Sequence, residues 1–235
     1  MLILGGTSEA RELAGLLGDE AITSLAGVTG APLLPEGPVR SGGFGGVDGL
    51  TAYCRAEAIT HIADATHPFA VNISRHAKAA ADALHLPYVR LERPAWTARG
   101  GDHWQCVPAL TAAAAAIPDG ARVLVTTGRK DLAPFLARPG LTGIIRMIEA
   151  PAVSLPETWQ LLLARPPFTV ESDLRLMRCA GITHLVSKNS GGEPTRAKLD
   201  AARALGLPVI MLTRPVKPAA LAFPDAAGLA VWLKA

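Results

Sequence analysis

The sequence predicts an α/β protein made of two Rossmann-like halves with mostly parallel sheets. Short apolar and β-branched segments alternate with amphipathic helical segments along the chain. Strands that alternate with helices form parallel sheets covered on both faces. The pattern pauses at "PDGA", residues 118–121, and then starts again. A chain of 235 residues allows one large domain or two smaller ones, and we favour two, 1–118 and 119–235.

The expected elements follow one another along the whole chain. Strands are expected at residues 2–4, 21–25, 60–63, 88–91, 122–126, 143–148, 183–186 and 208–212. Helices are expected at residues 8–17, 50–58, 71–84, 110–117, 172–180, 194–205 and 225–233. In an open parallel sheet, ligands bind outside the carboxyl ends of the strands, so the residues that follow each strand are the candidates for function.

Composition argues against several classes of protein. Hydrophobic residues make up 49% of the chain and charged residues 18%, which favours a packed globular protein over a disordered one. No apolar stretch reaches the ~18 to 20 residues of a membrane helix, and the N-terminus lacks a signal-peptide pattern, so we expect a cytoplasmic protein without a membrane partner. We interpret the three separated cysteines, Cys54, Cys106 and Cys179, as buried thiols. The histidines show no metal-ligand spacing, so no metal is expected.

The charge distribution points to a small anionic ligand. The net charge is only +3, but acidic residues outnumber basic ones in residues 1–108, whereas basic residues outnumber acidic ones in residues 109–235. A basic C-terminal half suits an anionic ligand, although solvated helix faces would give the same count. No basic segment contains interleaved aromatic residues, which argues against a nucleic-acid partner.

The turn after the first strand, "GGTSEA", has two interpretations. Gly5 and Gly6 allow a phosphate to approach the backbone closely, Thr7 and Ser8 can bond an oxyanion, and the following helix offers unpaired N–H groups. A plain strand-to-helix turn with Ser8 as the helix cap explains the same residues. The segment is not GxGxxG, so the turn alone does not decide.

The end of the second strand favours NADP over NAD. No Asp or Glu occurs in "SLAGVTG", residues 24–30, where an NAD enzyme would hold the ribose hydroxyls. The loop also lacks a matching basic residue, and Arg40 is the nearest candidate. The glycine-rich segment "SGGFGGVDGL", residues 41–50, either lines the adenosine side of a nucleotide site or forms a flexible surface loop.

Polar residues also follow later strands. In "DATHPFA", residues 64–70, His67 precedes a proline and is either a structural hydrogen bonder or an acid or base. In "TGRKD", residues 127–131, Arg129 either binds a phosphate or carboxylate or forms a surface pair beside Asp131.

Basic residues gather in the last third of the chain. Lys188 and Asn189 precede Ser190, Gly191 and Gly192 in a second polar turn. We expect three further cations to join this turn in an anion-binding rim, although any one of them alone could lie on a solvated face: Lys198, Arg214 and Lys217.

Six segments together resemble a known family. They are "ILGGTSEAR", "GGFGGVDGL", "DATHPFA", "ERPAW", "SKNSGG" and "KLDAARALGLPVIMLTRP", in this order. The chain is similar, from the first strand to Pro215, to the precorrin-6A reductase family of cobalamin biosynthesis. The resemblance implies an enzyme with an active-site cleft between its two halves. It also implies an NADPH-dependent reduction of precorrin-6A to precorrin-6B, with hydride transfer to a ring double bond and protonation of the adjacent carbon.

The resemblance also implies the roles of individual residues. The expected cofactor-binding residues are Gly5, Gly6, Thr7, Ser8, Glu9, Ser24, Thr66, Thr127, Gly128, Arg129, Asn189, Ser190 and Gly191. His67 and Lys188 are the catalytic candidates, although solvent can equally supply the proton. Arg40, Lys198, Arg214 and Lys217 are expected to bind the carboxylates of the tetrapyrrole substrate. The loop after the second strand departs from the expected pattern, because Val28 stands where a base is expected.

Two other classes of protein remain. A short-chain oxidoreductase would need a Tyr and a Lys four residues apart, but Glu57 and Glu92 follow Tyr53 and Tyr88 at that spacing. A non-catalytic NADP-binding sensor or assembly protein would keep the same phosphate turn, and only turnover separates it from a reductase. No sustained heptad or broad apolar stripe is present, so we expect a monomer.

Overall fold

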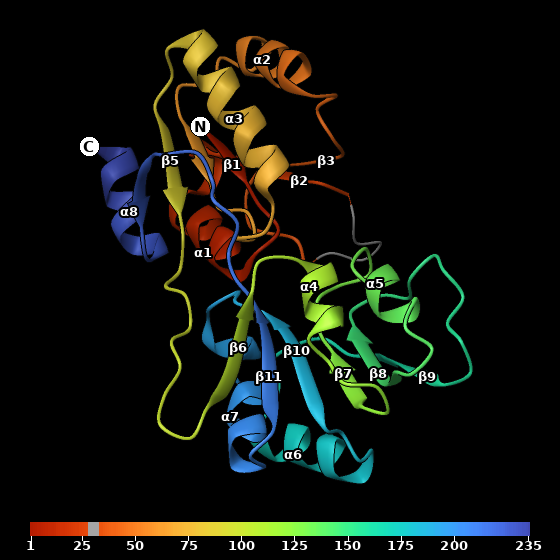
Figure 1. Cartoon of the computed structure of the whole chain (residues 1–235). Helices are drawn as coiled ribbons and strands as arrows, with labels where there is room; N and C mark the ends of the chain where they lie inside the picture. Colours follow the sequence, from red (N-terminus) through yellow and green to blue (C-terminus); the bar gives the residue numbers. More distant parts are fainter. Residues whose placement is uncertain (28–32) are drawn as a thin grey trace. The chain divides into compact units, whose positions relative to one another are not determined.

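The computed structural model describes residues 1–27 and 33–235. These residues form two compact units (Figure 1). Unit 1 contains Met1–Pro94 and Pro215–Ala235, and unit 2 contains Ala95–Arg214. Each unit has its own six-stranded sheet, and all of the strand pairs are parallel.

The sheet of unit 1 has the strand order β12-β5-β4-β1-β2-β3. Its strands are β1 (Leu2–Leu4), β2 (Ile22–Leu25), β3 (Val39–Ser41), β4 (Ile62–Asp64), β5 (Tyr88–Leu91) and β12 (Leu221–Phe223). Its helices are α1 (Ser8–Leu17), α2 (Val47–Ala56), α3 (Val71–Leu84) and α8 (Ala226–Lys234). Ile3 of β1 packs in one core with α1 and α8, whereas Leu2 and Leu4 pack in a second core with α2 and α3. This alternation buries both faces of the central strands, as the apolar run at the start of the chain requires.

The sheet of unit 2 has the strand order β6-β11-β10-β7-β8-β9. Its strands are β6 (His103–Val107), β7 (Arg122–Val125), β8 (Thr142–Met147), β9 (Trp159–Leu163), β10 (His184–Lys188) and β11 (Pro208–Leu212). Its helices are α4 (Leu110–Ala115), α5 (Ala133–Leu136), α6 (Val170–Cys179) and α7 (Ala197–Ala204). Leu124 and Leu185 of the central strands pack with Met177 of α6 and Leu199 of α7.

Both sheets have the Rossmann order 3-2-1-4-5-6. The sixth strand of unit 2, β6, precedes the other five in sequence, and the sixth strand of unit 1, β12, follows the whole of unit 2. β6 follows β5 in sequence but pairs with β11 of unit 2. β12 follows β11 but pairs with β5 of unit 1. The expected boundary at residues 118 and 119 therefore differs from the division in the structure, because 103–115 complete unit 2 and 221–234 complete unit 1.

The α/β class and the two Rossmann-like sheets are confirmed. Each of the eight expected strands and seven expected helices overlaps an observed one, and the strands at 2–4, 88–91 and 208–212 have the expected bounds. Four strands were not expected: β3, β6, β9 and β12. These are the edge strands of the two sheets, and their exposed residues weaken the apolar signal.

Two of the three cysteines differ from expectation. Cys54 is buried in α2, but Cys106 on the edge strand β6 and Cys179 at the end of α6 are exposed. The described part of the chain holds no helix with the length and apolar character needed to cross a membrane.

Candidate functional site

The opening turn of unit 1 lies close against the second strand. The Gly5 N–H donates to the Ser24 carbonyl over 2.9 Å, and a Cβ at Gly5 would lie 2.9 Å from the Thr23 methyl carbon. Gly6 has φ +110°, a conformation that L side chains rarely adopt. Gly5 is therefore favoured by its close packing against Thr23, and Gly6 by its backbone conformation.

The side chain that caps α1 is Thr7. Its hydroxyl oxygen accepts from the Ala10 N–H at 3.0 Å and donates to the Ala65 carbonyl at 2.8 Å. The cap proposed at Ser8 was wrong by one residue, since the Ser8 hydroxyl instead donates to the Glu9 carboxylate at 3.0 Å. Because the Thr7 hydroxyl is occupied, this turn offers an anion its backbone N–H groups rather than that side chain.

Glu9 is held by Arg93, which follows β5. The two side chains are 2.7 Å apart and partly buried. Burial opposes ionisation of Glu9, but the Arg93 hydrogen bond and charge, together with further hydrogen bonds, outweigh it and lower the pKa of this carboxyl below its ordinary value. Glu9 thus carries a negative charge at neutral pH and positions Arg93 at the carboxyl edge of the sheet.

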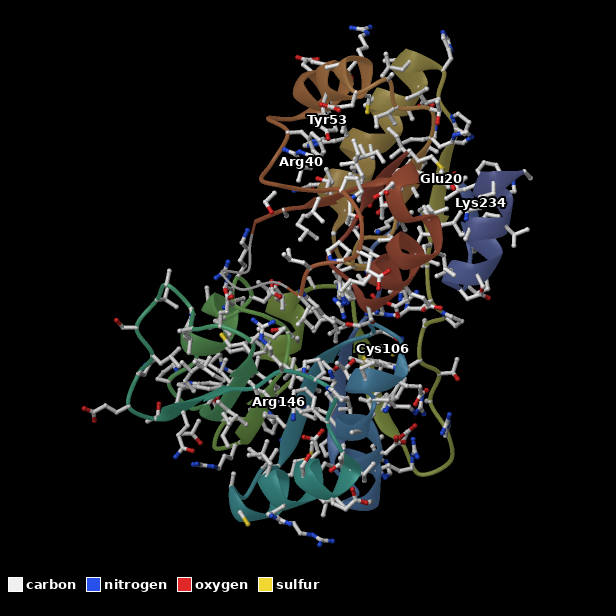
Figure 2. All side chains as sticks on the ribbon, turned by 180° about the vertical axis from the view of Figure 1, so that it is seen from behind. Glu20, Arg40, Tyr53, Cys106, Arg146 and Lys234 are labelled. Carbon is white, nitrogen blue, oxygen red and sulfur yellow. The ribbon has the colours of Figure 1, made fainter. Side chains whose placement is uncertain are left out.

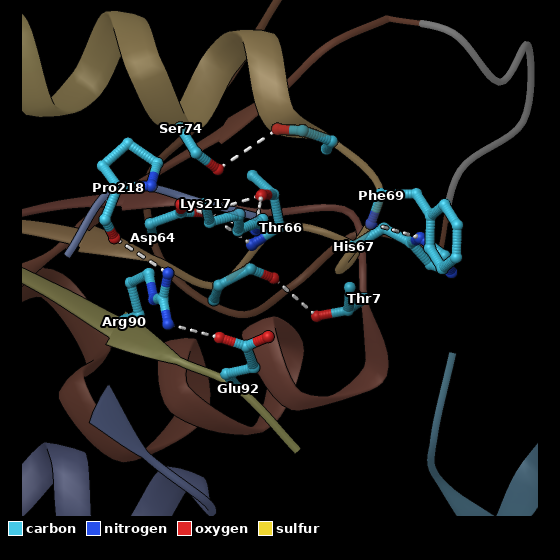
Figure 3. A network of polar contacts seen from close by, with 12 residues as sticks. Thr7, Asp64, Thr66, His67, Phe69, Ser74, Arg90, Glu92, Lys217 and Pro218 are labelled. Atoms are coloured by element: carbon cyan, nitrogen blue, oxygen red, sulfur yellow. Dashed lines mark hydrogen bonds and ion pairs between the residues drawn. The ribbon is translucent and has the colours of Figure 1, made fainter. Parts of the chain in front are cut away.

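A buried polar cluster organises the loop after β4 (Figure 3). Asp64 accepts from the Thr66 amide at 3.1 Å, from the Thr66 hydroxyl at 2.6 Å and from the Tyr88 hydroxyl at 2.7 Å. Lys217, from the segment that returns to unit 1, donates to the Thr66 hydroxyl at 3.0 Å and lies 3.6 Å from Asp64. The Asp64 side chain is 0% exposed and that of Lys217 4%, so these charges are shielded from solvent.

The cluster contains an ion pair with shifted pKa values. Burial disfavours the charged form of Asp64, but the Lys217 charge and hydroxyl hydrogen bonds outweigh it and lower the pKa of Asp64. Burial lowers the pKa of Lys217, with the Asp64 charge acting against it. Burial and the Asp64 charge raise the pKa of Tyr88, so its hydroxyl stays a proton donor. Lys217 therefore stabilises the loop that carries Thr66 and His67.

His67 lies in the turn that this cluster supports. Its Nδ1 accepts a hydrogen bond from the Phe69 N–H at 3.2 Å, and the Ala70 N–H donates to the His67 carbonyl at 2.8 Å. A ring nitrogen that accepts from a backbone N–H carries no proton, so the neutral ring has its proton on Nε2. The turn thus fixes the orientation of the imidazole.

A small hollow lies at the point where the strand order of unit 1 reverses. Its lining includes Thr7 after β1, Thr66 and Pro68 after β4, and Arg93 after β5. Since β1 and β4 are neighbours whose connections run in opposite directions along the sheet, this is the switch point at which open α/β sheets bind ligands.

The turn after β7 occupies the equivalent place in unit 2. Thr127 is 5% exposed, and its hydroxyl has no hydrogen-bond partner among the described residues. Gly128 has φ +115°, which lets the backbone turn sharply. Arg129 pairs with Glu149 at 3.2 Å. The buried Thr127 hydroxyl, which costs free energy when unpaired, is the feature of this turn that suits a polar ligand.

The loop after β10 is held by contacts within unit 2. Asn189 accepts from the Trp96 N–H at 2.8 Å and donates to the Trp96 carbonyl at 2.9 Å. Arg214 donates to the carbonyls of Asn189 and Ser190 at 2.9 and 3.0 Å. Lys188 pairs with Asp131 at 2.5 Å. The Asn189 amide group and Arg214 therefore shape this loop.

The residues of the expected anion-binding rim are divided between the two units. Lys217 belongs to the buried cluster of unit 1, whereas Lys198 and Arg214 lie in unit 2. Lys198 is 6% exposed in the first turn of α7, and its Nζ is 5.4 Å from the centre of the Trp96 ring. Arg40, the fourth expected substrate ligand, is the middle residue of β3, where its Nη1 donates to the Ser24 hydroxyl at 2.8 Å. Val28 lies outside the described residues.

Sequence reasoning missed several residues of the site. Asp64, Arg93 and Asp131 were not expected as site residues, although they contact the expected residues Thr66, Glu9 and Lys188. Tyr88, which was not expected there either, donates to Asp64. Of these residues, Asp64 was the easiest to predict from the sequence, because a carboxylate at the end of a buried strand needs buried partners. The partners of Arg93 and Asp131 are distant in sequence, and no spacing indicates them.

These two sheets, with glycine turns at their carboxyl edges, define an α/β protein of the Rossmann class. A family model described as "Precorrin-6x reductase CbiJ/CobK" matches residues 1–234, and the chain belongs to this family.

Curated proteins and a solved structure are similar to the chain over nearly its full length. It is 49% identical to a precorrin-6A reductase of Rhodococcus erythropolis, over 99% of this chain and 96% of that protein. It is 45% identical to a precorrin-6A reductase of Rhodobacter capsulatus, over 99% of this chain and 95% of that protein. A solved structure of CobK precorrin-6A reductase matches with a TM-score of 0.93 at 45% identity, over 99% of this chain and 95% of that one.

Proposed function

We propose that this chain is an NADPH-dependent reductase of cobalamin biosynthesis that converts precorrin-6A to precorrin-6B. One hydride goes to a double bond of the macrocycle and one proton to the adjacent carbon. The observation that carries the proposal is the full-length similarity to precorrin-6A reductases. The expected cleft between the two halves stays a prediction.

The residues of unit 1 fit a dinucleotide. Gly5 and Gly6 admit a phosphate close to the backbone, and the first amides of α1 can donate to it. NADPH, when bound, supplies the hydride. Ser8 lies beside these amides, and Ser24 at the end of β2 is the residue nearest to an expected ribose position.

In unit 2, the proposed nucleotide contacts are the Thr127 hydroxyl, the backbone of Gly128 and the loop of Ser190 and Gly191. Thr127 supports this role because its buried hydroxyl has no protein partner among the described residues. Asn189 acts through its pairing with Trp96, so it positions the loop rather than bonding a ligand with its amide group.

The substrate's carboxylates need cations that can exchange their partners. Arg129 and Lys188 are partly exposed at 34% and 19% in ion pairs with Glu149 and Asp131, so a carboxylate can compete for them. In this proposal the buried Lys217 and the loop-bound Arg214 are positioning residues, because their cationic groups already serve internal partners.

The proton has no single indispensable donor in this proposal. His67 keeps Nδ1 as an acceptor for Phe69, so forming the imidazolium would break that hydrogen bond. Lys188 shares its charge with Asp131. Solvent, His67 and Lys188 therefore remain alternative sources, while orientation of the two reactants provides most of the rate.

Isotope transfer tests the proposal directly. The purified chain is mixed with precorrin-6A and NADPH that carries deuterium at the reactive nicotinamide position, and the product is analysed by mass spectrometry and NMR. The proposal expects one deuterium from the nucleotide and one solvent proton on the adjacent carbon. Nucleotide binding without any reduced product would contradict it and favour a sensor. A parallel reaction with cobalt-precorrin-6A shows which form of the macrocycle is preferred.

A further inference from the structure

Arg40 and Ser24 are paired neighbours at the carboxyl edge of unit 1. In the parallel register of β2 and β3, Ser24 lies opposite Arg40, and Ser24 in turn lies opposite Leu4, the last residue of β1. The Ser24 side chain is buried, and its hydroxyl accepts from Arg40 Nη1 at 2.8 Å. The next residue after Leu4 is Gly5, so this pair adjoins the opening turn.

The Arg40 side chain is held in one orientation. Nη1 donates to the Gly42 carbonyl at 2.9 Å and Nη2 to the Gly43 carbonyl at 3.2 Å. Its guanidinium carbon lies 3.9 Å from the centre of the Phe44 ring and 5.0 Å from that of Tyr53, and Figure 2 shows Arg40 beside Tyr53. Stacking and hydrogen bonding together fix the plane of the guanidinium before any ligand arrives.

Within the described residues, the Arg40 guanidinium has N–H groups without an acceptor and no carboxylate that neutralises its charge. A guanidinium has five N–H groups, and the bonds to Ser24, Gly42 and Gly43 use both on Nη1 and one on Nη2. One N–H on Nε and one on Nη2 have no partner within residues 1–27 and 33–235. Within residues 1–27 and 33–235, Arg40 has no carboxylate partner, unlike Arg93 or Arg129. A partly exposed, oriented and unneutralised guanidinium suits a phosphate, which it can bind through two oxygens.

The position of the pair indicates which phosphate. In a Rossmann sheet the end of the second strand faces the adenosine ribose, where an acidic residue selects NAD and a nearby Arg accommodates the 2′-phosphate of NADP. Here that strand ends with Ser24 and Leu25, without an acid. We infer that Arg40, oriented by Ser24, binds the 2′-phosphate of NADPH and sets the preference for NADPH over NADH. The inference rests on the proposed function and replaces the substrate role expected for Arg40.

The competing interpretation is that Arg40 only fastens the glycine-rich loop after β3. If Arg40 only fastens the loop, its replacement would lower the stability of the folded chain. It would also weaken the binding of NADPH and NADH equally, because the bonds of Arg40 to Gly42 and Gly43 do not involve the 2′-phosphate. A 2′-phosphate role affects NADPH and leaves NADH almost unchanged. The ratio of the two dissociation constants therefore separates the two interpretations.

The test is a calorimetric titration of the full chain with NADPH, NADH, 2′,5′-ADP and 5′-AMP. For Arg40→Gln we expect NADPH and 2′,5′-ADP to bind about 10- to 100-fold more weakly, the loss typical of a charged hydrogen-bonded contact, with NADH and 5′-AMP within about twofold. Arg55→Gln is the matched control, because Arg55 is an exposed cation in the last turn of α2 of the same unit.

A second variant keeps the inference testable if Arg40→Gln folds poorly. Ser24→Asp retains Arg40 but adds a carboxylate that pairs with it, so NADPH should again bind more weakly while NADH binds as well or better. Equal losses for both nucleotides in the two variants, or no change in the ratio, would overturn the inference. If the unsubstituted chain binds neither nucleotide, the proposed function fails instead.

Discussion

The two units have the same strand order but use the residues after their strands differently. In unit 2 the cations after β7 and β10 are neutralised within the unit, as in Arg129–Glu149 and Lys188–Asp131. In unit 1 the buried cation Lys217 is neutralised in the same way, but Arg40 at the edge has no carboxylate partner among the described residues. The repeated Rossmann order therefore fixes where a ligand can bind, whereas the pairing of individual charges decides what it can be.

Replacing a buried cation should have the largest effect on stability. Lys217→Met leaves the fully buried Asp64 carboxylate without its charge partner, and we expect a loss of about 3 to 5 kcal/mol in the free energy of unfolding. Urea unfolding measures it. Lys78→Met is the control, since its pair with Asp82 is exposed and should be worth about 0.3 to 0.5 kcal/mol. Similar losses in the two variants would remove the distinction between buried and exposed pairs.

A side chain at Gly5 in the opening turn of unit 1 should weaken nucleotide binding, whereas one at a glycine of unit 2 should not. In Gly5→Val the new side chain meets Thr23 and Leu25 of β2, so the turn must shift away from its present position. We expect NADPH affinity to fall by about 100-fold or more, since both the amide donors and the close approach are lost. Gly100→Ala in unit 2, where a Cβ meets nothing within 4 Å, should bind normally. Unchanged binding by a folded Gly5→Val protein would argue that this turn is only a bend.

The buried pair also predicts acid sensitivity. Because the pKa of Asp64 is lowered in the folded chain, its contribution to stability is complete above the ordinary carboxyl pKa of 3.8 and is lost as pH falls through the folded value. Urea midpoints should therefore fall progressively below about pH 5. Asp64→Asn should flatten this dependence, whereas Asp82→Asn, at an exposed pair, should leave it in place. Parallel pH curves for all three proteins would contradict this assignment.

The smallest effect is expected at His67. Since its Nδ1 serves the Phe69 amide, His67→Ala should lower turnover by less than about tenfold, the low end of general-acid effects. Steady-state rates with saturating NADPH measure it, with His85→Ala at the C-cap of α3 as a control away from this turn. A loss of ~10³ would make His67 the proton donor.

The sequence predicted the central strands but not the edges of the sheets. Strands such as β1 and β11 are buried on both faces and appear as continuous apolar segments. The edge strand β3, "VRS", is short and largely exposed, so its sequence does not differ from that of a loop. The exchange of β6 and β12 was also hidden, because it depends on pairing between segments far apart in the sequence.

The geometry of the opening turn could be predicted because it depends on local chemistry. The close packing at Gly5 and the positive φ of Gly6 are features that only glycine readily allows. Lys217 was misplaced because its partners Asp64 and Thr66 are distant in sequence, and a lysine near the chain end normally lies in solvent. Pairing across the fold, which no local pattern shows, decides which cations are buried in ion pairs.

The central claim is that the opening turn of unit 1 is the phosphate-binding turn of an NADPH-dependent reductase. Its most direct test is the thermal unfolding midpoint of the unsubstituted chain with NADPH, with NADH and without nucleotide, followed by addition of precorrin-6A to the same samples. A ligand at about 100 times its dissociation constant stabilises the folded state by ~2.7 kcal/mol, or roughly 5 to 11 °C for a chain of this size. The account predicts such a shift with NADPH, a much smaller one with NADH, and oxidation of NADPH by the macrocycle. No shift with either nucleotide and no oxidation would contradict it.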